Sequence, residues 1–207
     1  MGEVLNKLLN AMNGRTTLIY GPAGSGKTNL SLWLLSMLSQ GTSNSSTNYF
    51  LSTEGMSFLY LIDRFNLEEN TLFINIISEN HLIDTVLKML LDSSRRASVI
   101  VVDSINSLYR AELATSSRAG YYMNIALALL SIIKRKNSSS VILTAQVKAG
   151  DNDVGISGYK TLLFWSDIVI KLVKKEVERE AVLVYPRSLS KLRFKFTVGE
   201  YGVRVIS

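Results

Sequence analysis

The stretch GPAGSGKT, residues 21–28, decides how this chain folds. It follows the short apolar run 16–20 and precedes residues 30–38, whose apolar side chains recur at helical spacing. Its glycines allow the backbone to bend so that successive N–H groups point inward, and the helix start adds the positive end of its dipole. A strand, a glycine-rich turn and a helix in this order predict a phosphate-binding P-loop.

The motif and the residue after it give the expected nucleotide contacts. We expect Lys27 to reach the β- and γ-phosphates and the Thr28 hydroxyl to coordinate Mg²⁺. The full set of expected nucleotide-binding residues is Gly21, Pro22, Ala23, Gly24, Ser25, Gly26, Lys27, Thr28 and Asn29. A chance glycine-rich turn would not match every motif position in this context. We therefore expect ATP and Mg²⁺ as ligands.

A second magnesium ligand is expected at the end of a buried strand. Residues 98–102 (SVIVV) form a β-branched run typical of a strand buried on both faces, and Asp103 follows directly. An aspartate in this position is the Walker B residue of P-loop ATPases, although it could instead only cap a following helix. Many of these ATPases place a catalytic glutamate next. Here that residue is Ser104, so the catalytic carboxylate must come from elsewhere or be absent.

The segment NYFLSTEG, residues 48–55, offers such a carboxylate in Glu54, directly after a short apolar run. If this strand lies beside the P-loop strand, Glu54 projects at the same sheet edge as Lys27 and Asp103. There it could orient and deprotonate the water that attacks the γ-phosphate. The alternative is that Glu54 starts the next helix, where its charge would offset the helix dipole. Spacing alone does not choose between these two roles.

Strand-like and helix-like segments alternate along the first 150 residues or so. Strands are expected at 16–20, 49–52, 73–77, 98–102 and 141–145, and helices at 30–38, 58–65, 82–91 and 121–133. This alternation predicts an α/β fold, a mostly parallel twisted sheet flanked by helices. Later strand-like runs, at 167–173, 181–185, 191–198 and 202–206, predict an antiparallel extension. We expect one domain over residues 1–207, with polar surface loops at 41–48 and 148–160.

Composition excludes several other classes of protein. Hydrophobic residues make up 47% of the chain and only 2 prolines occur, which argues against disorder. The absence of cysteine and the single histidine exclude disulfides, thiolate metal sites and a histidine-rich metal centre. The apolar runs are far shorter than the ~20 residues that span a bilayer. We therefore expect a cytoplasmic protein with no membrane partner. The net charge of +6 permits attraction to polyanions, although such a charge also aids solubility.

Four segments resemble the ATPase core of the RecA/RadA recombinase family: GPAGSGKT (21–28), STEG (52–55), VIVVDSINSLYRAEL (99–113) and ILTAQV (142–147). The resemblance implies a RecA-like P-loop ATPase core over about residues 15–207. STEG is similar to the family's DTEG, whose glutamate activates water, and this implies the same role for Glu54. ILTAQV is similar to TNQV, whose glutamine senses the γ-phosphate and couples ATP to the DNA-binding loops. That role would fall to Gln146.

The chain also departs from the family. Ser52 stands in place of the usual aspartate, and Ala145 in place of asparagine. The P-loop begins at residue 21, so we expect neither the N-terminal DNA-binding domain nor the polymerisation motif of RadA-type recombinases. The sequence is most similar to a core-only archaeal RadA paralogue of the RadB or RadC kind. This resemblance implies a weak ATPase, monomeric or weakly oligomeric, that binds single-stranded DNA and modulates the main recombinase.

The candidate DNA contacts follow from the same resemblance. By position, residues 114–122 resemble the family's first DNA-binding loop and residues 148–160 the second. Arg118, Lys148 and Lys160 are candidates for phosphate contacts, and Tyr121 or Tyr122 for stacking on bases. The alternative is ordinary surface charge and a tyrosine that packs at a helix start. The basic strand KLRFKF (191–196) could be a solvated face, a protected sheet edge or a contact with a neighbouring subunit.

Three functions remain open at this point. The first is a DNA-dependent ATPase that regulates homologous recombination. The second is a non-hydrolysing adaptor of the recombinase, with ATP as a structural ligand, and the third is a KaiC-like signalling ATPase without a DNA role. Glu54, Asp103 and Gln146 together favour an intact hydrolysis site over the adaptor. The positive charge and the YRAEL segment favour recombination over signalling.

Overall fold

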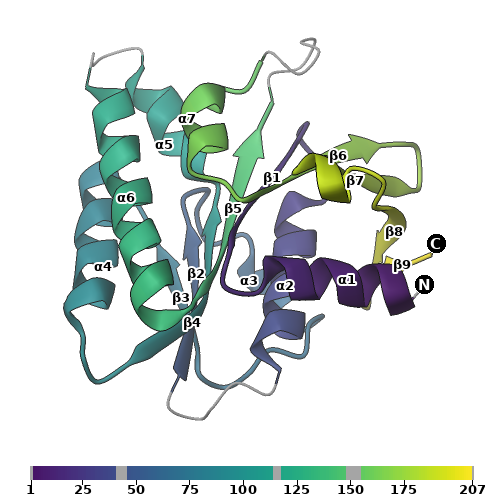
Figure 1. Ribbon diagram of the computed structural model, residues 1–207, viewed down its shortest axis with the longest axis horizontal. Helices are drawn as coiled ribbons and strands as arrows, with labels where there is room; N and C mark the ends of the chain where they lie inside the picture. Colours follow the sequence, from purple (N-terminus) through teal and green to yellow (C-terminus); the bar gives the residue numbers. More distant parts are fainter. Residues whose placement is uncertain (1, 41–45, 114–117, 148–154, 207) are drawn as a thin grey trace.

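A single sheet of nine strands runs through the computed structural model, which describes residues 2–40, 46–113, 118–147 and 155–206 (Figure 1). The strands are β1 (Thr16–Gly21), β2 (Ser46–Ser52), β3 (Thr71–Asn75), β4 (Arg96–Asp103), β5 (Ser140–Gln146), β6 (Ile168–Lys174), β7 (Arg179–Tyr185), β8 (Arg193–Gly199) and β9 (Gly202–Val205). Their order is β3-β2-β4-β5-β1-β6-β7-β8-β9. From β3 to β6 in this order neighbours are parallel, and from β6 to β9 they are antiparallel. The predicted α/β fold with a mostly parallel sheet is confirmed.

Helices cover both faces of this sheet. They are α1 (Gly2–Met12), α2 (Lys27–Ser39), α3 (Leu59–Ile62), α4 (Glu79–Leu91), α5 (Ile105–Glu112), α6 (Ala119–Asn137) and α7 (Tyr159–Phe164), with a 3-10 turn, η1, at Arg187–Leu189. Helices α4 to α7 lie on one face, and α1 to α3 on the other (Figure 1). Within the described residues, none of these helices is both long and apolar enough to cross a bilayer.

The two hydrophobic cores explain the continuous apolar run of β4. Ile100 and Val102 pack into the core beneath α4 and α6, whereas Val99 and Val101 pack into the core beneath α2. Side chains alternate between the two faces of a strand, so a strand covered on both faces needs apolar residues at every position. The apolar run at residues 98–102 therefore matches the pattern of a strand that is covered on both faces.

Three sequence predictions are wrong in detail. The loop predicted at 41–48 already contains the start of β2, because Ser46 pairs with Arg96 of β4 and accepts a hydrogen bond from the Asn70 side chain at 2.5 Å. The predicted antiparallel extension is confirmed for β7 to β9, and only its first strand differs, since β6 runs parallel to β1. The loop predicted at 148–160 includes the buried Ile156 and the first residues of α7, and residues 148–154 lie outside the described part of the chain.

The topology brings the conspicuous motifs to one edge of the sheet. The P-loop, Glu54 and Gln146 lie at the carboxyl ends of β1, β2 and β5, and Asp103 ends β4. In the strand register, Gly21 is the partner of Gln146, and Ser52 is the partner of Asp103. In open α/β sheets, ligands bind at this carboxyl edge.

A buried carboxyl group links the two helices that flank this edge. Glu79, in the first turn of α4, is 5% exposed, and burial together with the carboxylate of Glu112 raises its pKa from 4.5 to about 7. The folded protein therefore holds this proton more tightly than the unfolded chain does. The contribution of Glu79 to stability is greatest below pH 4.5 and is lost as the pH rises to about 7.

We expect Glu79→Gln to stabilise the protein by about 1–3 kcal/mol above pH 7, because the amide stays neutral. The gain should shrink as the pH falls and vanish near pH 4.5, as measured by urea unfolding across this range. Asp84→Asn removes a carboxylate from the exposed side of the same helix and serves as the control. A gain that is independent of pH would show that burial of a charged Glu79 is not the cause.

Candidate active site

The P-loop joins β1 to α2. Gly21 ends the strand, residues 22–25 form the turn, Gly26 is the N-cap of α2, and residues 27–29 begin the helix. Gly24 and Gly26 have φ values of 71° and 88°, which L-residues other than glycine rarely adopt. No side chain caps α2, and its first turn contains no acidic residue. The N–H groups at the start of this helix are therefore free to bind an anion, as the motif predicts.

Lys27 lies across the mouth of this loop. It is 7% exposed, and its Nζ donates hydrogen bonds to the carbonyl oxygens of Gly21 at 3.1 Å and Pro22 at 3.0 Å. Burial lowers the pKa of Lys27, while the negative charges of Asp103 and Glu54 oppose this shift. Both carboxylates therefore act on the same ammonium group, which agrees with the prediction that these three residues meet at one edge.

Asp103 is held between two hydroxyl groups. Its Oδ2 accepts a hydrogen bond from Thr28 Oγ1 at 2.7 Å, and its Oδ1 accepts one from the Thr144 hydroxyl. Burial raises the pKa of Asp103, and the two hydrogen bonds counteract this rise. Hard oxygen ligands suit Mg²⁺, which usually takes one or two protein groups together with phosphate oxygens and water. Thr28 and Asp103 fit that requirement. The described residues contain no cluster of three or more His, Cys, Asp or Glu side chains that could hold a metal.

The sequence alone does not show how the fold places Glu54 at the site. Strands β4 and β5 separate its strand, β2, from β1, so the condition of adjacent strands under which the sequence placed Glu54 at this edge is not met. The alternative role as a helix start is wrong, because α3 begins only at Leu59 and has no acidic residue in its first turn. Glu54 Oε1 instead accepts hydrogen bonds from Ser104 Oγ at 2.7 Å and Gln146 Nε2 at 2.8 Å.

Thr53 fixes the segment that carries Glu54 to the end of β4. Its backbone N–H donates to Asp103 O at 2.8 Å, and its hydroxyl donates to Ser104 O at 2.7 Å. The Ser104 N–H in turn donates to the Thr53 hydroxyl at 2.9 Å. The metal-ligating candidate and the candidate base therefore share one rigid connection, and a shift of either strand end moves both.

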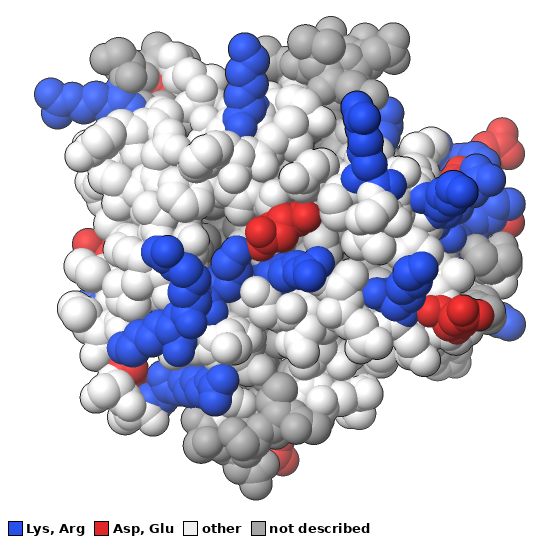
Figure 2. All heavy atoms as spheres, viewed as in Figure 1, with Lys and Arg blue, Asp and Glu red and all other residues white. Residues whose placement is uncertain are grey.

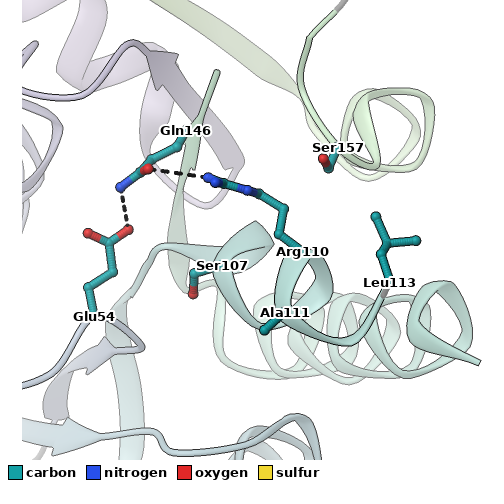
Figure 3. Close-up of a pocket in the computed structure, with 7 residues that line it drawn as sticks. All are labelled: Glu54, Ser107, Arg110, Ala111, Leu113, Gln146 and Ser157. Carbon is teal, nitrogen blue, oxygen red and sulfur yellow. Dashed lines mark hydrogen bonds between the residues drawn. The ribbon is translucent and has the colours of Figure 1, made fainter. Parts of the chain in front are cut away.

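Gln146 links Glu54 to helix α5. Figure 3 shows its side-chain amide between the carboxylate of Glu54 and the guanidinium group of Arg110. Arg110 Nη1 donates to Gln146 Oε1 at 3.3 Å. A guanidinium group can only donate, so the amide oxygen must face Arg110 and the amide nitrogen must face Glu54. Arg110 was not among the site residues predicted from the sequence, although it lies in the YRAEL segment that resembles the family.

An open cavity of about 760 Å³ lies beside this chain of three side chains. Its lining residues are Glu54, Ser107, Arg110, Ala111, Leu113, Gln146 and Ser157 (Figure 3). In Figure 3, Ser157 and Leu113 lie on the side of Arg110 away from Glu54. The cavity is thus bordered by the ends of the two segments that the resemblance assigns to DNA-binding loops.

Two further cations lie against the P-loop. A Cβ atom built on Gly24 would stand 3.2 Å from Lys174 Nζ, and one on Gly26 would stand 3.1 Å from Arg179 Nε. Both residues come from the β6–β7 hairpin. This hairpin lies beside the P-loop because β6 is the neighbour of β1 on the side away from β5. Nothing in the spacing of the sequence indicates this proximity, since the hairpin follows the P-loop by about 150 residues.

Three of the four predicted DNA contacts, Arg118, Tyr121 and Lys160, fall at the same end of the molecule as this cavity. Arg118 is the exposed N-cap of α6, and Lys160 is exposed on α7. Tyr121 is 66% exposed and makes an edge contact with Tyr122, with 6.1 Å between ring centroids. Lys148 lies outside the described residues. The role of all four residues in DNA binding stays a prediction.

Comparison with known proteins identifies the family. Residues 17–150 match the family described as "ATPase family associated with various cellular activities (AAA)". The chain is 32% identical over 208 residues to "DNA repair and recombination protein RadB" of Methanocaldococcus jannaschii, covering 95% of this chain and 96% of that protein. The protein of the same name from Methanococcus maripaludis strain C7 is 30% identical over 223 residues, with 99% of each chain covered. The chain therefore belongs to the RadB family, within the P-loop ATPases.

Proposed function

We propose that this protein is a weak ATPase that binds single-stranded DNA and modulates homologous recombination as an accessory to the main recombinase. The observation that carries the proposal is the meeting of Lys27, Asp103 and Glu54 at the carboxyl edge of the sheet, beside an uncapped helix start. The names of the related proteins, which place them in DNA repair and recombination, support the biological context.

Each residue of the site would have a distinct task in ATP hydrolysis. Lys27 and the loop N–H groups would bind the triphosphate and stabilise the charge that develops on it. A magnesium ion held by Thr28 and Asp103 would neutralise phosphate charge. Glu54 would orient the attacking water and accept its proton, since its Oε2 takes no part in the two hydrogen bonds that Oε1 accepts.

Gln146 would report the state of the nucleotide to the rest of the protein. It ends β5, close before residues 148–154, and its amide donates to the candidate base at 2.8 Å. A γ-phosphate near Glu54 offers the amide N–H a competing acceptor. If the amide of Gln146 exchanged one acceptor for the other, the start of the segment that carries Lys148 would move with it. The end of α5 that leads to Arg118 would move as well.

The test measures phosphate release from ATP, with and without Mg²⁺ and with and without a single-stranded oligonucleotide. We expect slow turnover that requires Mg²⁺ and rises when DNA is added. Asp103→Asn, which replaces the metal-ligating carboxylate, is the inactive reference. A pull-down of the cell's recombinase with and without ATP tests the accessory role. Wild-type protein that neither releases phosphate nor gains thermal stability with ATP and Mg²⁺ would refute the proposed function.

A further inference from the structure

Basic side chains gather at the sheet edge opposite the P-loop. We call this group the basal patch: Arg15, Lys88, Arg95, Arg96, Lys134, Arg135 and Lys136. They come from the turn before β1, the last turn of α4, the start of β4 and the last turn of α6. Figure 2 shows lysine and arginine side chains over this lower part of the molecule, where α4 and α6 end. Four segments that are separate in the sequence thus place their charges at one end of the fold.

Hydrogen bonds to backbone carbonyl groups hold the patch together. Lys136 Nζ donates to Leu90 O at 3.2 Å, which ties the end of α6 to the end of α4. Arg96 donates to Asn137 O twice, from Nε at 2.9 Å and from Nη2 at 2.7 Å. These acceptors are neutral, so the contacts position the side chains without cancelling their positive charge.

Few carboxylates oppose these cations. Asp167 pairs with Lys134 at 2.7 Å, and Asp92 lies beside Arg95. Seven cations against these two carboxylates leave the patch with a positive balance of about five charges. All patch cations except Lys134 are exposed, and exposed charges at such density attract a polyanion.

We propose that the basal patch binds the sugar–phosphate backbone of a nucleic acid without reading its bases. Long exposed lysine and arginine side chains on a fixed frame suit a row of phosphates, and phosphate contacts carry no sequence information. This inference rests on the proposed function and adds a second contact surface to it. The loops near Arg118 and Lys160 lie at the opposite edge, so one molecule can hold two nucleic-acid segments at once.

The experiment measures binding of a fluorescent poly-dT oligonucleotide as a function of salt. Arg95→Ala/Arg135→Ala removes two exposed patch cations, and neither side chain is a donor in the hydrogen bonds that hold the patch together. Affinity at 0.1 M salt should fall on the order of tenfold, and the slope of log K against log salt should become shallower by about 1.4. The matched control, Arg187→Ala/Lys191→Ala, makes the same change in net charge near η1 and should alter affinity less than twofold.

A third variant, Arg118→Ala/Lys160→Ala, separates this inference from the proposed function. If only the loop variant loses affinity, the basal patch does not bind nucleic acid, and the proposed function stands. Equal losses in the patch variant and its matched control would show a general effect of net charge and would also overturn the inference. If the wild type does not bind the oligonucleotide, both this inference and the proposed function are refuted. This holds whether or not the protein binds phosphatidylserine vesicles. Thermal melting confirms that each variant is folded.

Discussion

Glu54→Gln should reduce the turnover number for ATP roughly 100-fold or more while leaving nucleotide affinity nearly unchanged. Glutamine keeps the size of the side chain, and its Oε1 can still accept from Ser104 and Gln146, as that of Glu54 does at 2.7 and 2.8 Å. Only the negative charge and the basicity are lost. Phosphate-release kinetics give the turnover number, and titration with a fluorescent ATP analogue gives the affinity.

Ser104→Ala is the matched control for this prediction. It removes one of the two hydrogen bonds to the same carboxylate oxygen and leaves the base itself in place. We expect a decrease in turnover of less than about tenfold, which corresponds to the net value of one hydrogen bond. Equal turnover in Glu54→Gln and wild type would assign Glu54 a merely structural role and would leave the site without its proposed base.

The sequence predicts those parts of the fold that depend on short-range patterns. The eight residues of the P-loop follow an apolar run and precede apolar residues at helical spacing, and this order predicts a strand, a turn and a helix. The continuous apolar run of β4 predicts a strand buried on both faces, and each of its faces packs into its own core. The polar start of β2 could not be predicted, since Ser46 is in the sheet only because Asn70 and β4 satisfy its backbone. Tertiary partners override local propensity there.

The same distinction applies to the site. Spacing in the sequence does not give the order of the strands, so the placement of Glu54 was conditional on its strand lying beside the P-loop strand, and β4 and β5 in fact lie between them. The carboxyl edge of a parallel sheet nevertheless brings strand ends together whatever their order. The contact of Arg110 with Gln146 joins residues 36 positions apart, and the basal patch joins four separate segments. Only coordinates reveal such groupings.

Lys27→Met should weaken ATP binding by about 100-fold or more, because the charge-assisted hydrogen bonds to the phosphates are lost and the thioether cannot replace them. Methionine fills a similar volume at this buried position, so the fold should persist. Isothermal titration with ATP and Mg²⁺ measures the affinity, and thermal melting without nucleotide confirms folding.

Lys174→Met provides the same substitution at a second lysine beside the same loop, where Nζ lies 3.2 Å from the position of a Cβ on Gly24. Lys174 is exposed, so water screens its charge, and we expect less than a threefold change in affinity. The dependence of ATP affinity on pH gives a second test of Lys27. Burial lowers the pKa of Lys27, so wild-type affinity should begin to fall at a pH below that at which an ordinary lysine loses its proton, while the affinity of Lys27→Met should lack this step. Similar losses in both variants would mean that the loop binds phosphate through the general field of nearby cations, and that no single lysine makes the decisive contact.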